Sequence, residues 1–188
     1  MYFDIYILSY LMETPHYGYE IKKKLSESVG ACATISNNTL YPILRKYENM
    51  GAATKSVEQN DGGQERIVYT LTDKGRKVFV DMLWNFPDSM INNRDEFCTR
   101  LSFFPFLSRE ARVRLLDLRE KFLKDSRGKV EKGLAAPNLP SHKAKLREFH
   151  MRIIEGEEEL IRHFRARVDE PCLLTEDGRF ACEVAPQE

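Results

Sequence analysis

Three runs of apolar residues at helical spacing open the chain and predict three short helices. The first run covers residues 5–12 and ends at Thr14-Pro15, and the second starts after Gly18. The third run ends at Gly51, a residue type that commonly follows a helix. Its apolar face consists of Leu40, Ile43, Leu44 and Tyr47.

The start of the third helix is left open over four residues. Residues 36–39 are all of types that favour the N-cap position, so any of them can cap the helix. Pro42 has no N–H to donate, so we expect it in or near the first turn.

Two strands and a fourth helix are predicted next. The strands cover residues 53–59 and 64–72, and the residues between them, 60–63, read Asn-Asp-Gly-Gly, which is typical of a hairpin turn. The second strand alternates two sets of side chains, Ile67, Tyr69 and Leu71 on one side and Arg66, Val68 and Thr70 on the other. Thr72-Asp73 then caps a helix that runs to Phe86.

Pro87 marks a domain boundary, beyond which the pattern is helical. The predicted helical segments are 88–104, 108–136 and 141–168, and the last carries a near-heptad apolar stripe. The stripe consists of Leu146, Phe149, Ile153, Leu160 and Phe164. The predicted domains are 1–86 and 87–168, with a tail, 169–188, that forms a small hairpin or is disordered.

The composition argues against a membrane or secreted protein but does not indicate a binding partner. The chain has 188 residues, with 29 Lys and Arg against 29 Asp and Glu. Its net charge is therefore zero and does not indicate a nucleic-acid-binding protein. The longest apolar stretch is too short to cross a bilayer, and the N-terminus lacks the features of a signal peptide. A cytoplasmic protein without a membrane partner is expected.

The sequence lacks the residue patterns that catalytic and metal sites need. The four cysteines are widely spaced, and the four histidines have no ligand partners at useful spacing, which argues against a disulfide scaffold, a zinc site and any other metal site. No nucleophile elbow, phosphate loop or dinucleotide fingerprint is present, so we expect neither an enzyme nor a cofactor. The acidic run at 155–159 is interpreted as a solvated helix face.

The third helix and the hairpin carry the clearest functional signal. Three helices followed by a glycine-tipped hairpin form a winged helix-turn-helix arrangement, in which one helix enters the major groove of DNA. The fold class is therefore mainly α with a small β-hairpin wing, followed by an all-helical domain. Asparagine can pair with adenine edges, and arginine with guanine edges or phosphate. The side chains that the third helix would present are Asn37, Asn38, Thr39, Tyr41 and Arg45.

Three sequence blocks resemble the PadR-type transcriptional regulators. They are His16-Tyr17-Gly18-Tyr19-Glu20-Ile21, then Ile35-Ser36-Asn37-Asn38-Thr39-Leu40-Tyr41-Pro42-Ile43-Leu44, and then Gly62-Gly63 with Tyr69-Thr70-Leu71-Thr72-Asp73-Lys74-Gly75. The resemblance covers about the first 86 residues closely, and the rest only in length and pattern. It implies a homodimeric repressor or activator that binds an inverted-repeat operator in double-stranded DNA. It also implies a small hydrophobic or aromatic effector, such as a phenolic acid, that lowers the affinity for DNA.

The resemblance also implies where DNA would be contacted. The recognition-helix positions are Ser36, Asn37, Asn38, Thr39, Tyr41 and Arg45. The positions that approach phosphates are His16, Tyr17 and Lys22 from the second helix, and Gln64, Arg66 and Tyr69 from the wing.

Two departures from the family pattern bear on these positions. Tyr17 is an extra residue between His16 and Gly18, and Gln64 and Glu65 stand where the family often has proline and basic residues after Gly-Gly. Because Glu65 would repel phosphate, a protein–protein module without DNA affinity is the second hypothesis for the function.

Several of these side chains have structural alternatives. Tyr41 and Tyr69 can be core aromatics, and Asn37 and Asn38 can be cap residues alone. The stripe of the last helix can pack within the chain, form a dimer seam, or do both. Trp84 and Phe86 belong either to the core or to an effector site.

Overall fold

The computed structural model describes residues 2–28, 35–59, 65–136 and 138–181. The chain forms two compact units, and each is described separately below. One comprises the residues up to Phe86 together with those from Leu173 onward, and the other comprises Pro87–Cys172. The first will be called the N-terminal unit and the second the helical unit.

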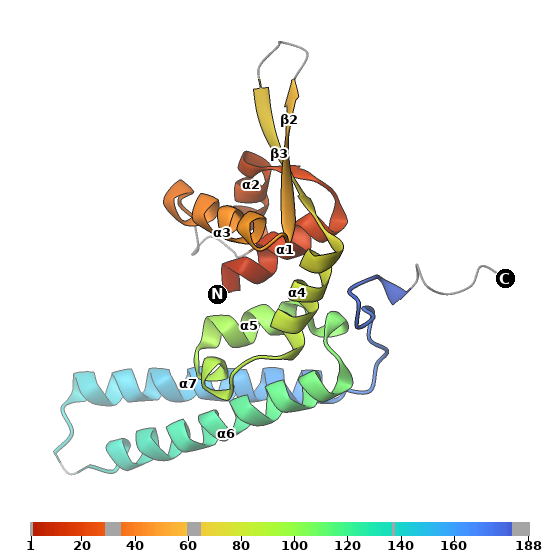
Figure 1. Ribbon diagram of the computed structural model, residues 1–188. Helices are drawn as coiled ribbons and strands as arrows, with labels where there is room; N and C mark the ends of the chain where they lie inside the picture. The colour runs from red at the N-terminus through yellow and green to blue at the C-terminus, as the bar shows by residue number, and fades with distance from the viewer. Residues whose placement is uncertain (1, 29–34, 60–64, 137, 182–188) are drawn as a thin grey trace. The chain divides into compact units, whose positions relative to one another are not determined.

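The N-terminal unit contains four helices and a small sheet (Figure 1). The helices are α1 (Tyr2–Glu13), α2 (Gly18–Ser28), α3 (Asn37–Asn49) and α4 (Asp73–Trp84). The strands are β1 (His16–Tyr17), β2 (Ala53–Gln59) and β3 (Glu65–Leu71), in the order β1-β3-β2 with antiparallel pairing throughout. The predicted fold class, mainly α with a hairpin wing, is confirmed.

A buried polar cluster fixes α3 against α1. Tyr47 of α3 donates its phenolic hydrogen to Asp4 Oδ1 at 2.7 Å, and Lys46 Nζ donates to the same oxygen at 2.8 Å. Asp4 and the Tyr47 ring are almost fully buried. Because a buried carboxylate needs partners, this cluster holds the two helices in one relative position.

Strand β1 was not predicted from the sequence. Its two residues pair with the middle of β3, His16 with Tyr69 and Tyr17 with Val68. The predicted alternation put Ile67 and Tyr69 on one face, yet Tyr69 is buried and Ile67 is exposed. Beyond the end of β1, the β2–β3 ribbon has no third strand beside it, so its side chains reach solvent.

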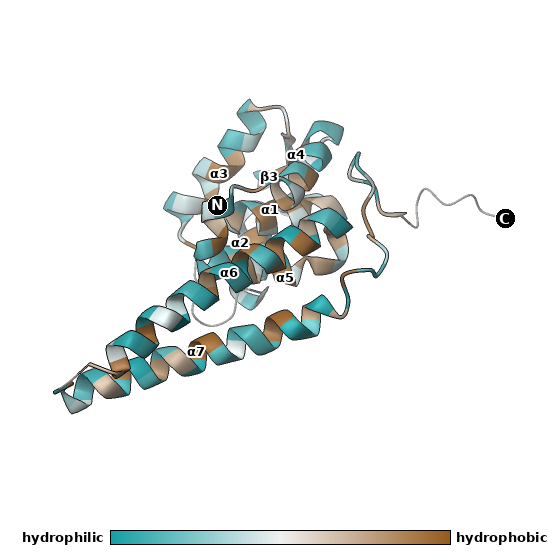
Figure 2. Ribbon diagram, turned by 90° about the horizontal axis from the view of Figure 1, so that it is seen from below, coloured by the Kyte–Doolittle hydropathy of each residue, from teal (hydrophilic) through white to brown (hydrophobic). Residues whose placement is uncertain are grey.

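The helical unit is built on two long antiparallel helices, α6 (Arg109–Leu134) and α7 (Ser141–Arg165), which lie side by side (Figure 1). Both are amphipathic, with apolar and polar residues interleaved along their length (Figure 2). The predicted helix over 88–104 is instead a 3₁₀ turn, η1 (Asp88–Asn92), followed by α5 (Arg94–Ser102). Asn93 separates them because its side chain caps α5, accepting from the amides of Asp95 and Glu96. A second 3₁₀ turn, η2 (Phe104–Phe106), precedes α6.

Two buried arginines hold the helical unit together. Arg119 of α6 forms an ion pair with Glu157 of α7 at 2.6 Å, and both side chains are buried. The interpretation of the acidic run as a solvated face is therefore wrong at Glu157. Arg112 donates only to backbone carbonyls, those of Phe104, Pro105, Val168, Glu170 and Pro171.

The described part of the tail forms a small turn in the N-terminal unit. Leu174 pairs with Phe180 in an isolated antiparallel bridge, and Leu174 is buried. Gly178 has a φ of +79° and lies against the backbone of Arg76 in α4, where a larger residue would collide. Within the described ranges, no helix has the length and apolar character to span a membrane, and no cluster of three metal-ligating side chains occurs.

Candidate nucleic-acid interface

The exposed face of α3 lies opposite its buried face. Ser36 is the N-cap, in extended conformation, and its hydroxyl is 3.0 Å from that of Thr39. Leu40, Leu44 and Tyr47 point into the core. The other face is exposed and carries the predicted set, Asn37, Asn38, Thr39, Tyr41 and Arg45. Amide, hydroxyl and guanidinium groups therefore cluster at the N-terminal half of the helix.

Pro42 lies at the start of the second turn of α3, near the first turn as predicted. Because proline has no N–H, the carbonyl of Asn38 receives no hydrogen bond from residue 42. The ladder of i+4 backbone hydrogen bonds in α3 is thus interrupted at this carbonyl.

Helix α2 continues this surface. Lys22 Nζ donates to the side-chain oxygen of Asn37 at 3.0 Å, so the lysine charge lies at the start of α3. The Tyr41 ring packs on Gly18, where an added Cβ would be 3.0 Å from the ring, and it stays 43% exposed. Tyr41 is thus neither a core residue nor fully free, and it joins α2 to α3.

The base of the wing carries an aromatic and charged cluster on the β1 side of β3. The rings of Tyr17 and Tyr19 are stacked, 5.6 Å apart and within 9° of parallel. The Arg66 guanidinium lies over both, 5.7 Å and 5.8 Å from their centroids. Tyr17 donates its hydroxyl to Glu58 at 3.0 Å, and this hydrogen bond raises the pKa of Tyr17. Arg66 thus adds a positive charge to those of Lys22 on α2 and Arg45 on α3, while Glu58 and Glu65 add negative charge to the wing.

Sequence reasoning missed Tyr19 and Glu58 in this cluster. The hairpin register places Glu58 directly opposite Arg66. A turn over the predicted residues 60–63 would instead have paired Glu58 with Glu65, so the predicted register was wrong by one residue. Nothing in the local pattern indicates that Tyr17 and Tyr19 meet Arg66, because their partner strand lies some 50 residues further along the chain.

Two predicted contact residues are not presented to solvent. Tyr69 is only 6% exposed, and its burial raises the pKa of its hydroxyl. The His16 side chain is also largely covered, and its ring nitrogens face Glu20 at 3.4 Å and Thr14 at 3.3 Å. Tyr69 therefore takes the core alternative that the sequence left open, and the expectation that His16 lies on the surface is corrected. Gln64 lies outside the described residues.

Glu20 anchors the turn that precedes α2. Although burial raises its pKa, hydrogen bonds from the Tyr17 amide and from His16 lower the pKa of Glu20 below its usual value. The carboxylate stays ionised and holds the backbone of Tyr17 at 3.0 Å, which fixes where the Tyr17 ring points.

The predicted stripe of α7 divides into three parts. Leu146, Phe149 and Leu160 are 55%, 51% and 37% exposed. Phe164 packs on Phe104 inside the helical unit, with ring centroids 4.7 Å apart, and Ile153 lines a cavity. The stripe therefore serves packing within the chain at some positions and leaves apolar surface at others.

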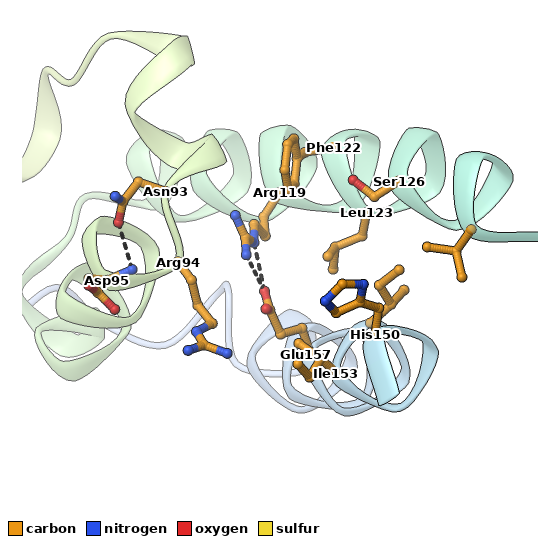
Figure 3. A pocket seen from close by; sticks show the side chains of 12 residues that line it. Asn93, Arg94, Asp95, Arg119, Phe122, Leu123, Ser126, His150, Ile153 and Glu157 are labelled. Carbon is orange, nitrogen blue, oxygen red and sulfur yellow. Dashed lines mark hydrogen bonds and ion pairs between the residues drawn. The ribbon is translucent and has the colours of Figure 1, made fainter. Parts of the chain in front are cut away.

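The cavity lies between α6, α7 and the start of α5 and measures about 460 Å³ (Figure 3). Its apolar wall includes Phe122, Leu123 and Ile153, and its polar side includes His150 and the Arg119–Glu157 pair. The Arg119 guanidinium also lies 4.9 Å from the Phe122 ring centroid. An apolar wall with a few converging polar groups suits a small ligand that has a ring and a polar substituent.

The two residues predicted for an effector site, Trp84 and Phe86, are not among those that line this cavity. Phe86 is buried, and Trp84 is partly buried. The cavity depends on the register of α6 against α7, and the periodicity of either helix alone does not give that register.

Comparison with known proteins gives sequence matches that agree with the geometry of α3 and the wing. Residues 7–81 match the model of the transcriptional regulator PadR-like family. A relative from Bacillus subtilis (strain 168), described as negative transcriptional regulator PadR, is 29% identical over 134 residues, which is 69% of this chain and 74% of the relative.

Solved structures of related proteins match as well. A PadR family transcription regulator from hypervirulent Clostridium difficile R20291 is 31% identical, over 42% of this chain and 80% of that one, with a TM-score of 0.38. Bacillus subtilis PadR in complex with operator DNA is 25% identical, over 88% of this chain and 96% of that one, with a TM-score of 0.41.

The N-terminal unit defines a protein of the winged helix-turn-helix class, with α3 as its exposed helix and the β2–β3 ribbon as its wing. By its sequence, the chain belongs to the PadR-like family of transcriptional regulators.

Proposed function

We propose that this protein is a homodimeric transcriptional repressor that binds an inverted-repeat operator and is released by a small aromatic ligand. The observation that carries the proposal is the exposed face of α3, where Asn37, Asn38 and Arg45 lie beside Lys22 on one surface. Such a face offers both hydrogen bonds to base edges and charge for phosphates.

The base contacts are assigned to α3. Asn38 and Arg45 carry the side chains that pair with adenine and guanine edges in the major groove. Lys22, at the start of α3, supplies charge for the phosphate backbone, which fixes the register of the helix without contributing sequence specificity.

The dimer is assigned to the helical unit. Leu146, Phe149 and Leu160 present apolar side chains along α7, and a second copy would cover them. A two-fold dimer presents two copies of α3 to two half-sites, one helical turn or a multiple apart, and therefore binds an inverted repeat.

Repression and release rest on two further observations. The Bacillus subtilis relative is described as a negative regulator. The 460 Å³ cavity of the helical unit offers apolar walls beside His150 and Arg119. A ligand that prefers a dimer geometry unsuited to the operator lowers DNA affinity by its differential affinity for the two states.

The test is a titration of the full-length protein into labelled DNA from upstream of its own gene, and into shuffled DNA, over a salt series. We expect tighter binding to the native sequence, with log K falling by about 0.9 per phosphate neutralised for each decade of salt. A folded dimer that binds neither DNA would favour the protein–protein module, which the neutral net charge and Glu65 also suit.

A further inference from the structure

The wing cluster holds the guanidinium of Arg66 beside two aromatic rings. The guanidinium lies over the rings of Tyr17 and Tyr19, and these rings are stacked on each other. Tyr19 is 55% exposed, so the cluster lies at the surface and not in the core. A cation over an aromatic ring is attracted by the electron density of the ring face.

This arrangement leaves the donors of Arg66 unused. Among the described residues the side chain of Arg66 makes no hydrogen bond and no ion pair, although it is only partly exposed. The five N–H groups of a guanidinium lie in its plane and form a rigid fork of donors. An edge with free N–H groups matches the two oxygens of a phosphate.

Glu58 ties the cluster together from the neighbouring strand. It lies directly opposite Arg66 in the β2–β3 ladder, and its carboxylate accepts the hydroxyl of Tyr17 at 3.0 Å. The Tyr17 hydroxyl is thus committed to Glu58, which leaves it unsuited to donating to DNA. Because Glu58 is the cross-strand partner of Arg66, its negative charge would oppose an anion bound by Arg66.

We propose that Arg66 binds a backbone phosphate with its guanidinium edge, that Tyr17 and Tyr19 are positioning residues that hold it there, and that Glu58 weakens this contact. The inference rests on the proposed DNA binding and on the phosphate contact of Arg66 that the family resemblance implies. It adds the means by which Arg66 is held and the residue that limits the strength of the contact. It gives Tyr17 a different task from the phosphate contact that the family resemblance implies.

The experiment measures the salt dependence of operator binding for the full-length protein and single variants, with a fluorescein-labelled duplex from upstream of its own gene. Arg66→Ala should weaken binding and make the slope of log K against log salt shallower by about 0.9, the value for one phosphate. Arg66→Lys should keep the slope but bind more weakly, because an ammonium cannot make the two parallel hydrogen bonds. Lys77→Ala, which removes an exposed cation of α4 outside the cluster, is the matched control and should change neither quantity.

The positioning role is tested by a double-mutant cycle. Tyr19→Leu should weaken binding about two- to fivefold, as expected for the loss of an exposed cation–π contact. The same substitution should have no effect in the Arg66→Ala background, because Tyr19 acts only through Arg66. Glu58→Gln keeps an acceptor for Tyr17 and removes the charge, so it should strengthen binding.

The possible results distinguish a failure of DNA binding from a failure of the wing contact alone. Absence of DNA binding by the unmutated protein would overturn the proposed function and this inference together. Binding with an unchanged slope for Arg66→Ala would overturn only the wing contact. An equal effect of Tyr19→Leu with and without Arg66 would show that Tyr19 acts on its own, which would overturn the positioning role.

Discussion

The residues of α3 divide into a buried set that fixes the helix in the N-terminal unit and an exposed set that is available to bind DNA. Along this one helix, Leu40, Leu44 and Tyr47 are buried, whereas Asn38 and Arg45 are exposed. The division could be predicted from the sequence because apolar spacing fixes which face of a helix is covered. Substitutions on the two faces should therefore have opposite consequences, for stability on one and for binding on the other.

Removal of the exposed side chains should weaken operator binding without unfolding. Asn38→Ala and Arg45→Ala are each expected to cost about 1–3 kcal/mol of operator affinity, because each removes a hydrogen-bonding group that faces a base edge. Anisotropy titration gives the affinity and thermal melting gives the stability. Unaltered binding by both variants at unaltered melting temperature would remove α3 from the DNA surface.

Removal of one buried hydroxyl should do the reverse. Tyr47→Phe takes away the hydrogen bond to Asp4 and leaves that buried carboxylate with one donor fewer, at a cost of about 1–3 kcal/mol of unfolding free energy. Urea denaturation measures this cost, and Tyr41→Phe, at a half-exposed ring, is the control and should have little effect. Equal stability of the two variants would contradict the role of the Asp4 cluster.

At the scale of elements, local pattern and long-range pairing account for different parts of the fold. The helices of the N-terminal unit and the β2–β3 hairpin follow from apolar spacing and a turn sequence. Strand β1 does not, because a two-residue strand has no pattern of its own and its pairing with β3 is distant in the chain. The break at Asn93 did have a signal, since an asparagine followed by Asp95 and Glu96 is typical of a helix start.

Glu157 shows how a charge run can conceal a buried residue. It lies four residues after Ile153 and four before Ile161, on the apolar face of α7, and this spacing was a signal that the acidic composition hid. Its partner, Arg119, could not be found from the sequence, because the pairing depends on the register of α6 against α7. The cavity beside this ion pair was missed for the same reason.

Loss of one partner of this ion pair should damage the helical unit. Glu157→Leu leaves the Arg119 charge buried without its carboxylate and should cost about 3–5 kcal/mol of unfolding free energy, measured by chemical denaturation. The double variant Arg119→Met with Glu157→Leu should recover much of that loss, because no uncompensated charge remains. A double variant as unstable as the single one would contradict this explanation.

At the scale of the whole molecule, we propose DNA binding by the N-terminal unit and dimerisation by the helical unit. The N-terminal unit carries the family's motifs, and the helical unit carries exposed apolar residues on α7. The sequence predicted both parts, but it could not indicate which members of the α7 stripe stay exposed. That outcome depends on the packing of Phe164 on Phe104 and of Ile153 at the cavity.

Dimerisation should therefore depend on the exposed part of the stripe. Leu146→Asp combined with Phe149→Asp in the full-length chain should give a folded monomer, because two charges would be buried in the seam without partners. Removal of all residues after Phe86 should abolish the dimer as well. Sedimentation velocity measures both, and a dimer that persists in the double variant or in the fragment would place the seam elsewhere.

Protection of guanine N7 from methylation tests whether α3 enters the major groove, because that atom lies in this groove. The account predicts two blocks of protected guanines in the operator, related by two-fold symmetry and separated by one helical turn, about 10 base pairs, or a multiple of it. Arg45→Ala should remove part of each block. A single block, or no protection under conditions in which the protein binds the duplex, would contradict a dimer that contacts the major groove with α3.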